Sequence, residues 1–311
     1  MVILVIVVVV GGIVGYSMSS QNQQAGTIKV SGAWALYPMM VKWGEAYQKL
    51  YPSIKVEVSA GGAGKGMTDA LAGLVDIGMV SRNIYPEEIA NGAFYVTVVE
   101  DAVVPVVNQD NPVISDILAK GITRETFYKI YITGEITTWG QVVGRPEITD
   151  PINVYTRSDA AGAPETWANY LGKKQENLLG IGVYGDPGLL DAVKNDHLGI
   201  GYNNIGYAYD ANTRAQVDGI SVVPIDIDGS GQIEPGESVY QTLDQIDAAI
   251  SQGIFPHPPA RGENLVTKGN FTGITLNFVR WILTDGQNYA QESGFVPLSN
   301  DVAQAQLQKL R

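Results

Sequence analysis

The sequence predicts an α/β protein with a largely parallel sheet. From residue 27 onwards, short runs rich in β-branched residues alternate with amphipathic runs of helical period. This alternation is typical of parallel sheets covered by helices. Glycine-rich segments follow several of the predicted strands and lead into predicted helices. No internal repeat is evident.

The elements follow one another in a regular order when short β-rich runs are read as strands and amphipathic runs as helices. Strands are predicted at residues 28–31, 54–59, 75–79, 95–98, 102–108, 152–155, 199–203 and 265–267. Helices are predicted at residues 37–51, 66–73, 115–120, 124–133, 164–171, 188–196, 238–252 and 274–284.

Composition restricts the function. The chain has 311 residues, 45% of them hydrophobic, so it can bury one large core or two medium ones. Twenty Lys and Arg against 32 Asp and Glu give a net charge of -12, which argues against nucleic acid or an anionic membrane surface as a partner. An anionic ligand therefore needs local positive potential. The absence of cysteine excludes disulfides, a thiolate nucleophile and a lipid-modified cysteine.

The N-terminal segment differs from the rest of the chain. Residues 1–18 are almost wholly apolar, and residues 19–25 form a polar spacer. The apolar stretch is at the short end for a membrane span and lacks the basic region of a secretory signal. We expect residues 1–25 to be an export signal or an uncleaved membrane anchor, and the protein to be extracytoplasmic, either secreted or membrane-anchored.

Three glycine- or alanine-rich corners follow strands and open helices. We call residues 31–38 (SGAWALYP) the first corner, residues 60–66 (AGGAGKG) the second, and residues 156–167 (TRSDAAGAPETW) the third. Ligands of open α/β sheets bind beyond the carboxyl ends of strands, where helix N-termini offer free N–H groups. Three converging corners would form an anion site, whereas any one alone is an ordinary strand-to-helix turn.

In combination, these segments resemble the phosphate-binding proteins of ABC-type phosphate importers. The resemblance extends collinearly over residues 27–298. The segments that carry it are SGAWALYPMMVKWGEAYQKLYP, AGGAGKGMTDALAGLVDIGMVSR, AVVPVVN, TGEITTWGQV, RSDAAGAPETW, GIGYNNIGYAY and GFVPLS.

The resemblance implies a two-lobed periplasmic-binding-protein-like fold of type II. Each lobe would be a mainly parallel sheet flanked by helices, and two hinge strands, residues 102–108 and 263–268, would join the lobes. Lobe one would comprise residues 26–104 and 264–311, and lobe two residues 105–263. Such a protein captures phosphate in the cleft between its lobes and delivers it to ABC permease subunits; we expect a monomer.

The resemblance also implies an anion site, but several family hydroxyls are missing. One charge-assisted hydroxyl bond contributes roughly 1.5–3 kcal/mol, so another oxyanion (tungstate, molybdate or sulfate) stays open as the ligand. Lys65 and Arg82 are each as readily a solvated charge as a ligand contact. The expected side-chain contacts are Arg157, Ser81 and Lys65, the expected backbone donors are Tyr37, Gly64 and Gly162, and the positions without hydroxyls are Ala35, Leu36, Ala63, Ala161 and Ala163.

A second motif lies at residues 226–237 (DIDGSGQIEPGE) and fits the twelve-residue calcium loop of EF-hands. Carboxylates at positions 1, 3 and 12, an oxygen at position 5 and a glycine at position 6 suit a hard, oxygen-seeking ion. The alternative is an acidic surface turn. We expect a structural Ca²⁺ held by Asp226, Asp228, Ser230, the Gln232 carbonyl and Glu237, with Glu234 acting through water.

No catalytic pattern is visible. His197 and His257 lie in unrelated contexts, without a nucleophile elbow or a triad signature, so we expect binding and not catalysis. Two other functions stay open: a calcium-stabilised surface protein with a degenerate cleft, and a sensor that binds an anion without feeding a permease.

Overall fold

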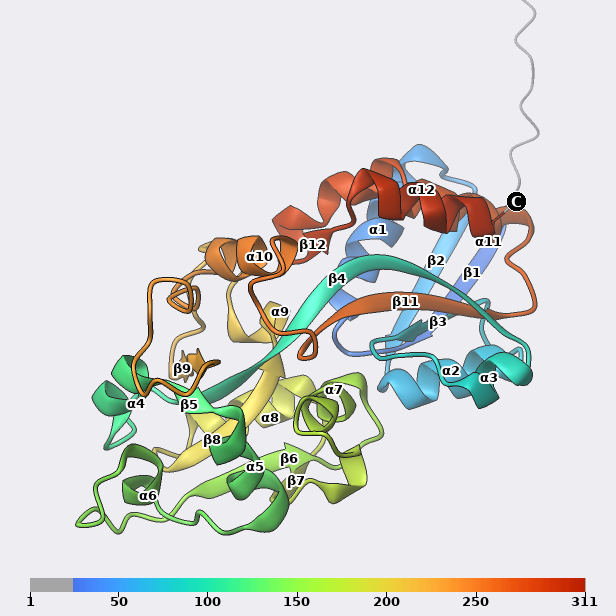
Figure 1. Cartoon of the computed structure of the whole chain (residues 1–311). Coiled ribbons are helices and arrows are strands. Elements are labelled where there is room, and N and C mark those ends of the chain that lie inside the picture. The colour runs from blue at the N-terminus through green and yellow to red at the C-terminus, as the bar shows by residue number, and fades with distance from the viewer. Residues whose placement is uncertain (1–24, 311) are drawn as a thin grey trace, which may run out of the picture.

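One curved mixed sheet runs through both lobes of the computed structural model, which describes residues 25–310 (Figure 1). Its strand order is β2-β1-β3-β11-β4-β8-β6-β7, and β9 and β12 also pair with β4. A separate two-stranded sheet joins β10 to β5. The predicted two-lobed α/β fold is confirmed.

Lobe one is built on three parallel strands. The strand β1 (Gly26–Gly32) pairs with β2 (Ile54–Ala60) on one side and with β3 (Ile77–Val80) on the other. Helix α1 (Tyr37–Leu50) has proline in its first turn, where the missing N–H costs no helical hydrogen bond. The other helices of lobe one are α2 (Ala63–Leu71), α3 (Pro86–Ala90), α11 (Gly273–Ile282) and α12 (Asn300–Lys309).

Lobe two repeats this arrangement. The strand β6 (Asn153–Arg157) pairs in parallel with β7 (Ile181–Val183) and with β8 (Gly199–Asn204). Its remaining elements are α4 (Ile114–Lys120), β5 (Ile122–Thr123), α5 (Arg124–Tyr128), α6 (Trp139–Val143), α7 (Gly162–Tyr170), α8 (Gly185–Lys194), α9 (Ile205–Ala208), β9 (Ile220–Val222), β10 (Ile225–Asp226) and α10 (Leu243–Ser251).

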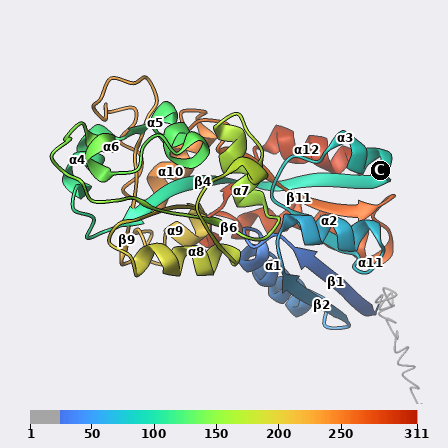
Figure 2. The same ribbon diagram turned by 90° about the horizontal axis from the view of Figure 1, so that it is seen from below.

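Two long antiparallel strands connect the lobes. They are β4 (Ala93–Asn108) and β11 (Ala260–Lys268), which pair from Ala260 opposite Ala102 to Lys268 opposite Ala93. Seen from below, β4 extends through both lobes (Figure 2). Its first half packs in the core of lobe one and its second half in the core of lobe two. The short strand β12 (Val296–Pro297) pairs with the middle of β4.

Three element predictions were wrong. The predicted strands at residues 95–98 and 102–108 are one strand, because the acidic pair between them also lies inside the sheet. The helix predicted at residues 238–252 begins only at Leu243, where the Thr242 hydroxyl caps it by accepting from Gln245 N–H at 3.3 Å. The helix predicted at residues 124–133 changes to a π-helical turn at Lys129–Thr133.

The predicted anchor falls almost entirely outside the described residues, which begin at residue 25. Within residues 25–310, no helix combines the length and the apolar character that crossing a membrane requires.

Candidate functional site

The second and third corners meet directly between the lobes. Gly64 N–H donates to the Ala160 carbonyl at 3.2 Å. A side chain at Gly162 would overlap both the hydroxyl and the carbonyl oxygen of Ser81. Gly162 therefore allows the start of α7 to lie against the end of β3, and the structure brings Ser81, Gly64 and Gly162 together at the junction.

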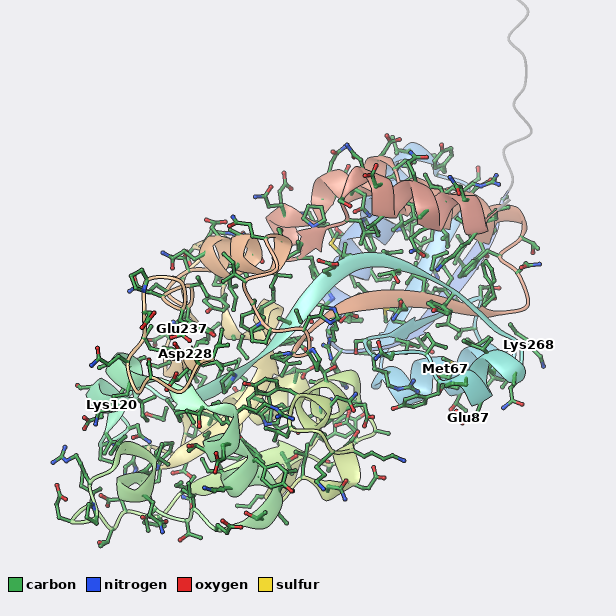
Figure 3. All side chains as sticks on the ribbon, in the orientation of Figure 1. Met67, Glu87, Lys120, Asp228, Glu237 and Lys268 are labelled. Atoms are coloured by element: carbon green, nitrogen blue, oxygen red, sulfur yellow. The ribbon has the colours of Figure 1, made fainter. Side chains whose placement is uncertain are left out.

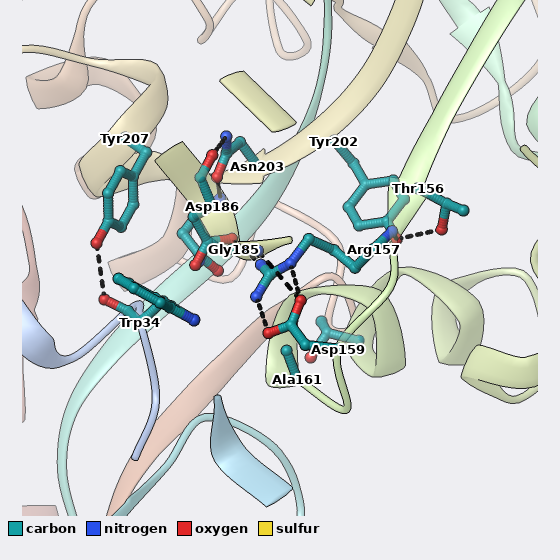
Figure 4. Close-up of polar contacts among 12 residues, drawn as sticks. Trp34, Thr156, Arg157, Asp159, Ala161, Gly185, Asp186, Tyr202, Asn203 and Tyr207 are labelled. Carbon is teal, nitrogen blue, oxygen red and sulfur yellow. Dashed lines mark hydrogen bonds and ion pairs between the residues drawn. The ribbon is translucent and has the colours of Figure 1, made fainter. Parts of the chain in front are cut away.

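A buried ionic cluster lies at the end of β6, and we call Arg157, Asp159 and Asp186 the Arg157 centre (Figure 4). The Arg157 side chain is 0% exposed. Its Nε and Nη2 donate to the two carboxylate oxygens of Asp159 at 2.7 and 2.6 Å, and its Nη1 donates to Asp186. A guanidinium has five N–H bonds, so two remain for a further acceptor.

Neighbouring groups set the position of the Arg157 centre. Thr156 and Tyr202 share a hydrogen bond of 2.7 Å between their hydroxyls, and Arg157 N–H donates to Tyr202 at 3.3 Å. Gly185 N–H donates to Asp159 at 3.2 Å. The strand β6 thus presents Arg157 at its carboxyl end, where α7 also begins.

The electrostatics of the Arg157 centre favour fixed ion pairs. Burial opposes the charge of Arg157, but Asp186 and Asp159 outweigh it and raise the pKa of the guanidinium. Burial also acts to raise the pKa of Asp159, but Arg157 lowers it overall. Burial raises the pKa of Asp186 to about 6. Above that pH two carboxylates face one guanidinium, so the Arg157 centre is negative by one charge.

Asp186 was not predicted from the sequence. It lies in the first turn of α8 and is 2% exposed. The segment GDPG, which follows β7, is a fourth strand-to-helix corner and was the available signal.

The positions that lack hydroxyls are buried at the corners. Two expected backbone donors already have protein acceptors in this structure: Tyr37 N–H donates to the Trp34 carbonyl at 3.2 Å, and Gly64 N–H to Ala160 as described. The N–H groups of Gly162 and Ala163, at the start of α7, have no acceptor within their own helix. The buried alanines and leucine are Ala35, Leu36, Ala63, Ala161 and Ala163.

The two further cationic side chains near the site, Lys65 and Arg82, each form an ion pair with a carboxylate. Lys65 pairs with Asp69 on α2, and its side chain is 48% exposed. Arg82 donates to both oxygens of Glu88 at 2.9 and 2.7 Å. Neither cation is free to replace the missing hydroxyls in this arrangement.

A cavity of about 440 Å³ opens beside the Arg157 centre. Both lobes line it, lobe one through Gly64 and Arg82 and lobe two through Arg157, Ala161 and Glu165. Gly64 and Ala160, which form the hydrogen bond between the second and third corners, both line it, so the cavity adjoins their contact.

Comparison with known proteins agrees with this architecture. Residues 17–285 match the family described as the PBP superfamily domain. The chain belongs to this family. It is 26% identical to the phosphate-binding protein PstS of Methanocaldococcus jannaschii, over 94% of this chain and 88% of that protein. It is 22% identical to the phosphate-binding protein PstS of Bacillus subtilis, over 91% and 85%.

The fold of this PBP domain also occurs in solved structures. A substrate-binding protein ascribed to a phosphate ABC transporter of Clostridium perfringens, with bound phosphate, superposes with a TM-score of 0.71. The match covers 88% of this chain and 100% of that chain at 23% identity, which establishes the fold alone.

We call β4 and β11, the two strands that connect the lobes, the crossing strands of the PBP domain. They carry a second buried ionic group, the hinge cluster, consisting of Asp101, Arg261 and Glu263. Arg261 lies opposite Asp101 in the β4–β11 register, with 3.1 Å between Nη2 and Oδ2, and its Nε is 3.2 Å from Glu263. Arg261 also donates to the Thr166 hydroxyl on α7 at 2.9 Å. Burial raises the pKa of Glu263 to about 8 and also raises that of Asp101.

The predicted calcium loop lies at the end of lobe two that is remote from lobe one (Figure 3). One carboxylate oxygen from each of Asp226, Asp228 and Glu237 lies within 4.8 Å of the other two. Asp226 is 3% and Glu237 8% exposed. Asp226 accepts from Gly231 N–H at 3.0 Å and Glu237 from Ile227 N–H at 2.7 Å, so the loop folds around its own acidic groups.

The other expected ligands of the loop are close in sequence and structure. Ser230 donates its hydroxyl to the Gln232 carbonyl at 2.9 Å, and Glu234 N–H donates to Glu237 at 3.3 Å. Every side chain or carbonyl expected to face the ion offers oxygen, which suits Ca²⁺.

Proposed function

We propose that this PBP domain is the extracytoplasmic solute-binding protein of an ABC importer, which captures inorganic phosphate between its lobes and delivers it to permease subunits. The observation that carries the proposal is the buried Arg157, held at the junction of the lobes beside the first turn of α7. The names of the two PstS relatives support phosphate as the ligand. No step of this function requires catalysis.

The proposed function requires the two lobes to move apart so that the anion can enter between them. The Gly64–Ala160 hydrogen bond and the contact between Gly162 and Ser81 close the junction in this structure. An entering anion would replace the Ala160 carbonyl as the acceptor of Gly64 N–H and would accept from the free N–H bonds of Arg157. Charge-assisted bonds of this kind are stronger than the amide–carbonyl bond that they replace. The anion would thereby favour closure.

Calorimetric titration tests the proposal. Residues 26–311 contain both hydrophobic cores and the helices and strands described above, and would be titrated separately with phosphate, sulfate, tungstate and molybdate. We expect saturable binding of phosphate. A preference for tungstate or molybdate would assign a different oxyanion to the site. Absence of heat and of a thermal shift with all four would contradict the importer function and favour a surface protein or a sensor.

We further propose that residues 1–25 export the chain or tether it to the membrane, and that the PBP domain acts as a monomer. The apolar character of residues 1–18 supports the first proposal. Expression of the full chain followed by membrane fractionation tests it: the protein should sediment with membranes or appear shortened outside the cell. Recovery of the full-length chain in the cytosol would contradict it.

We also propose a structural Ca²⁺ in the loop at residues 226–237. Two buried carboxylates and one exposed carboxylate converge there, and clustered carboxylate oxygens are the ligands that Ca²⁺ prefers. The test is the rise in melting temperature caused by Ca²⁺. Glu237→Gln should abolish the rise, and Glu45→Gln, on the exposed surface of α1, should leave it intact. An equal rise in both variants would rule the loop out.

A further inference from the structure

We propose that Trp34 is a ligand-contacting residue that donates its indole N–H to the bound oxyanion. The inference rests on the proposed function. Trp34 belongs to the first corner, between β1 and α1, where neither Ala35 nor Leu36 can supply a side-chain hydrogen bond. The sequence did not single it out, because a tryptophan beside apolar residues is ordinarily core.

The indole nitrogen of Trp34 is completely buried and has no hydrogen-bond partner among residues 25–310. A buried donor without an acceptor costs the full desolvation penalty of its N–H group. The ring is nevertheless held in place: its plane meets that of Tyr184 at 90°, with centroids 6.0 Å apart. The Tyr207 hydroxyl also donates to the Trp34 carbonyl at 3.1 Å. Lobe two therefore orients a lobe-one tryptophan.

The edge of the ring that carries the N–H lies at the Arg157 centre. A Cβ on Gly185 would be 3.4 Å from Cε2 of Trp34, the carbon bonded to the indole nitrogen. Gly185 in turn donates to Asp159, which holds Arg157. In Figure 4 the indole nitrogen is on the side of the ring that faces Arg157 and Asp159. The orphaned donor thus lies on the edge of the ring that faces the Arg157 centre.

The chemistry of the donor also limits the ligand. An indole donates one hydrogen bond and accepts none, whereas the hydroxyl of a serine or threonine does both. Trp34 therefore recognises an unprotonated oxygen of the anion. Its carbon framework also occupies space that a hydroxyl side chain would leave to water, which strengthens charge-assisted bonds in the closed site.

Trp34→Phe tests the inference because it keeps an aromatic ring and removes the donor. The phosphate affinity should fall roughly ten- to a hundredfold, as expected for one hydrogen bond to a charged group. Trp281→Phe is the matched control. The Trp281 nitrogen is also buried without a partner among the described residues, but its ring packs against Phe278 and Tyr47 in the core of lobe one. Its substitution should leave the phosphate affinity unchanged.

Proton NMR of the wild-type protein gives a readout that does not depend on a folded variant. The Trp34 indole signal, assigned through its contacts with the Tyr184 ring, should move downfield as phosphate is added, while the Trp281 signal stays in place. Saturable phosphate binding with an unmoved Trp34 signal, or with equal affinity in Trp34→Phe, would overturn the role of Trp34 and leave the proposed function standing. Absence of phosphate binding by the wild type would overturn both.

Discussion

Arg157 is held by two carboxylates, whose combined negative charge exceeds the single positive charge of the guanidinium. Asp159 and Asp186 fix the direction of the guanidinium through three hydrogen bonds, and this rigidity suits a site that must present N–H groups in one geometry. The second carboxylate also repels an incoming anion. The affinity of the site therefore reflects a balance between orientation of Arg157 and excess negative charge.

Asp186→Asn should shift that balance towards binding. The amide oxygen can still accept from Arg157, but the negative charge is gone, so phosphate affinity at about pH 8 should rise roughly tenfold. Since the pKa of Asp186 is about 6, the aspartate becomes protonated in the wild type at lower pH. The difference between the two proteins should accordingly shrink at about pH 5.

The measurement is calorimetric titration at both pH values. Asp191→Asn, at an exposed position on the same helix, is the control and should bind phosphate as the wild type does. A weaker or unchanged affinity of Asp186→Asn at the higher pH would show that orientation of Arg157 outweighs the charge.

Some single residues of the site could be predicted from the sequence, and others could not. Arg157 lies at the end of a strand and Gly162 at the start of the next helix, and this local pattern can be recognised in the sequence. Asp186 and Trp34 reach the same place from α8 and from the other lobe. The role of Asp186 depends on how α8 packs beside β6, and the role of Trp34 on how the two lobes pack, and no local pattern encodes these contacts.

At the scale of elements, the start of α7 is the contact on which closure depends. The backbone of Gly162 lies against Ser81, with no room for a Cβ atom. Any side chain there must push α7 away from β3 or change the angle between the lobes.

Gly162→Ala should therefore impair closure. Overpacking of this kind typically costs about 1–3 kcal/mol, so phosphate affinity should fall roughly five- to a hundredfold. Small-angle scattering with saturating phosphate should show a larger radius of gyration than for the wild type. Gly206→Ala, where no atom lies within 4 Å of the added Cβ, is the control. Wild-type affinity and compaction in Gly162→Ala would contradict the close approach.

One carboxyl group of the crossing strands, that of Glu263, has a raised pKa. Glu263 is completely buried, and its pKa rises from 4.5 to about 8 because burial and the nearby Asp101 outweigh the attraction of Arg261. The folded protein thus binds more protons than the unfolded chain between these two pH values. The free energy of unfolding that comes from Glu263 must then fall as pH rises through this window.

Glu263→Gln removes that dependence. We expect the free energy of unfolding of the variant, relative to the wild type, to increase as pH rises from about 5 to about 8, by up to about 1.4 kcal/mol per pH unit. Denaturant titrations at several pH values measure it, with Glu45→Gln as the control. A difference between Glu263→Gln and the wild type that is independent of pH would mean that Glu263 is ionised throughout.

The course of β4 illustrates what element prediction misses. Glu100 and Asp101 interrupt an apolar run and lie between the two strands predicted at residues 95–98 and 102–108. In the structure, Asp101 faces Arg261 across the β4–β11 pair, so the neighbouring strand supplies the opposite charge that lets an acidic residue stay inside the sheet. The partner lies far along the chain, and local composition cannot reveal it.

At the scale of the whole molecule, the two cores are linked by one sheet and by polar contacts across the junction. β4 and β11 contribute to both cores, while Gly64 with Ala160 and Tyr207 with Trp34 join the lobes. These few hydrogen bonds are weak compared with either core. The lobes can therefore part at the crossing strands while each core stays intact.

A crystal structure grown with phosphate at about ten times its dissociation constant tests the central claim most directly. The account predicts an anion between the lobes, within hydrogen-bond distance of Arg157 and of the first-turn N–H groups of α7, with the Gly64–Ala160 bond broken. An unchanged Gly64–Ala160 bond with no anion at the Arg157 centre, or phosphate bound only elsewhere, would contradict it.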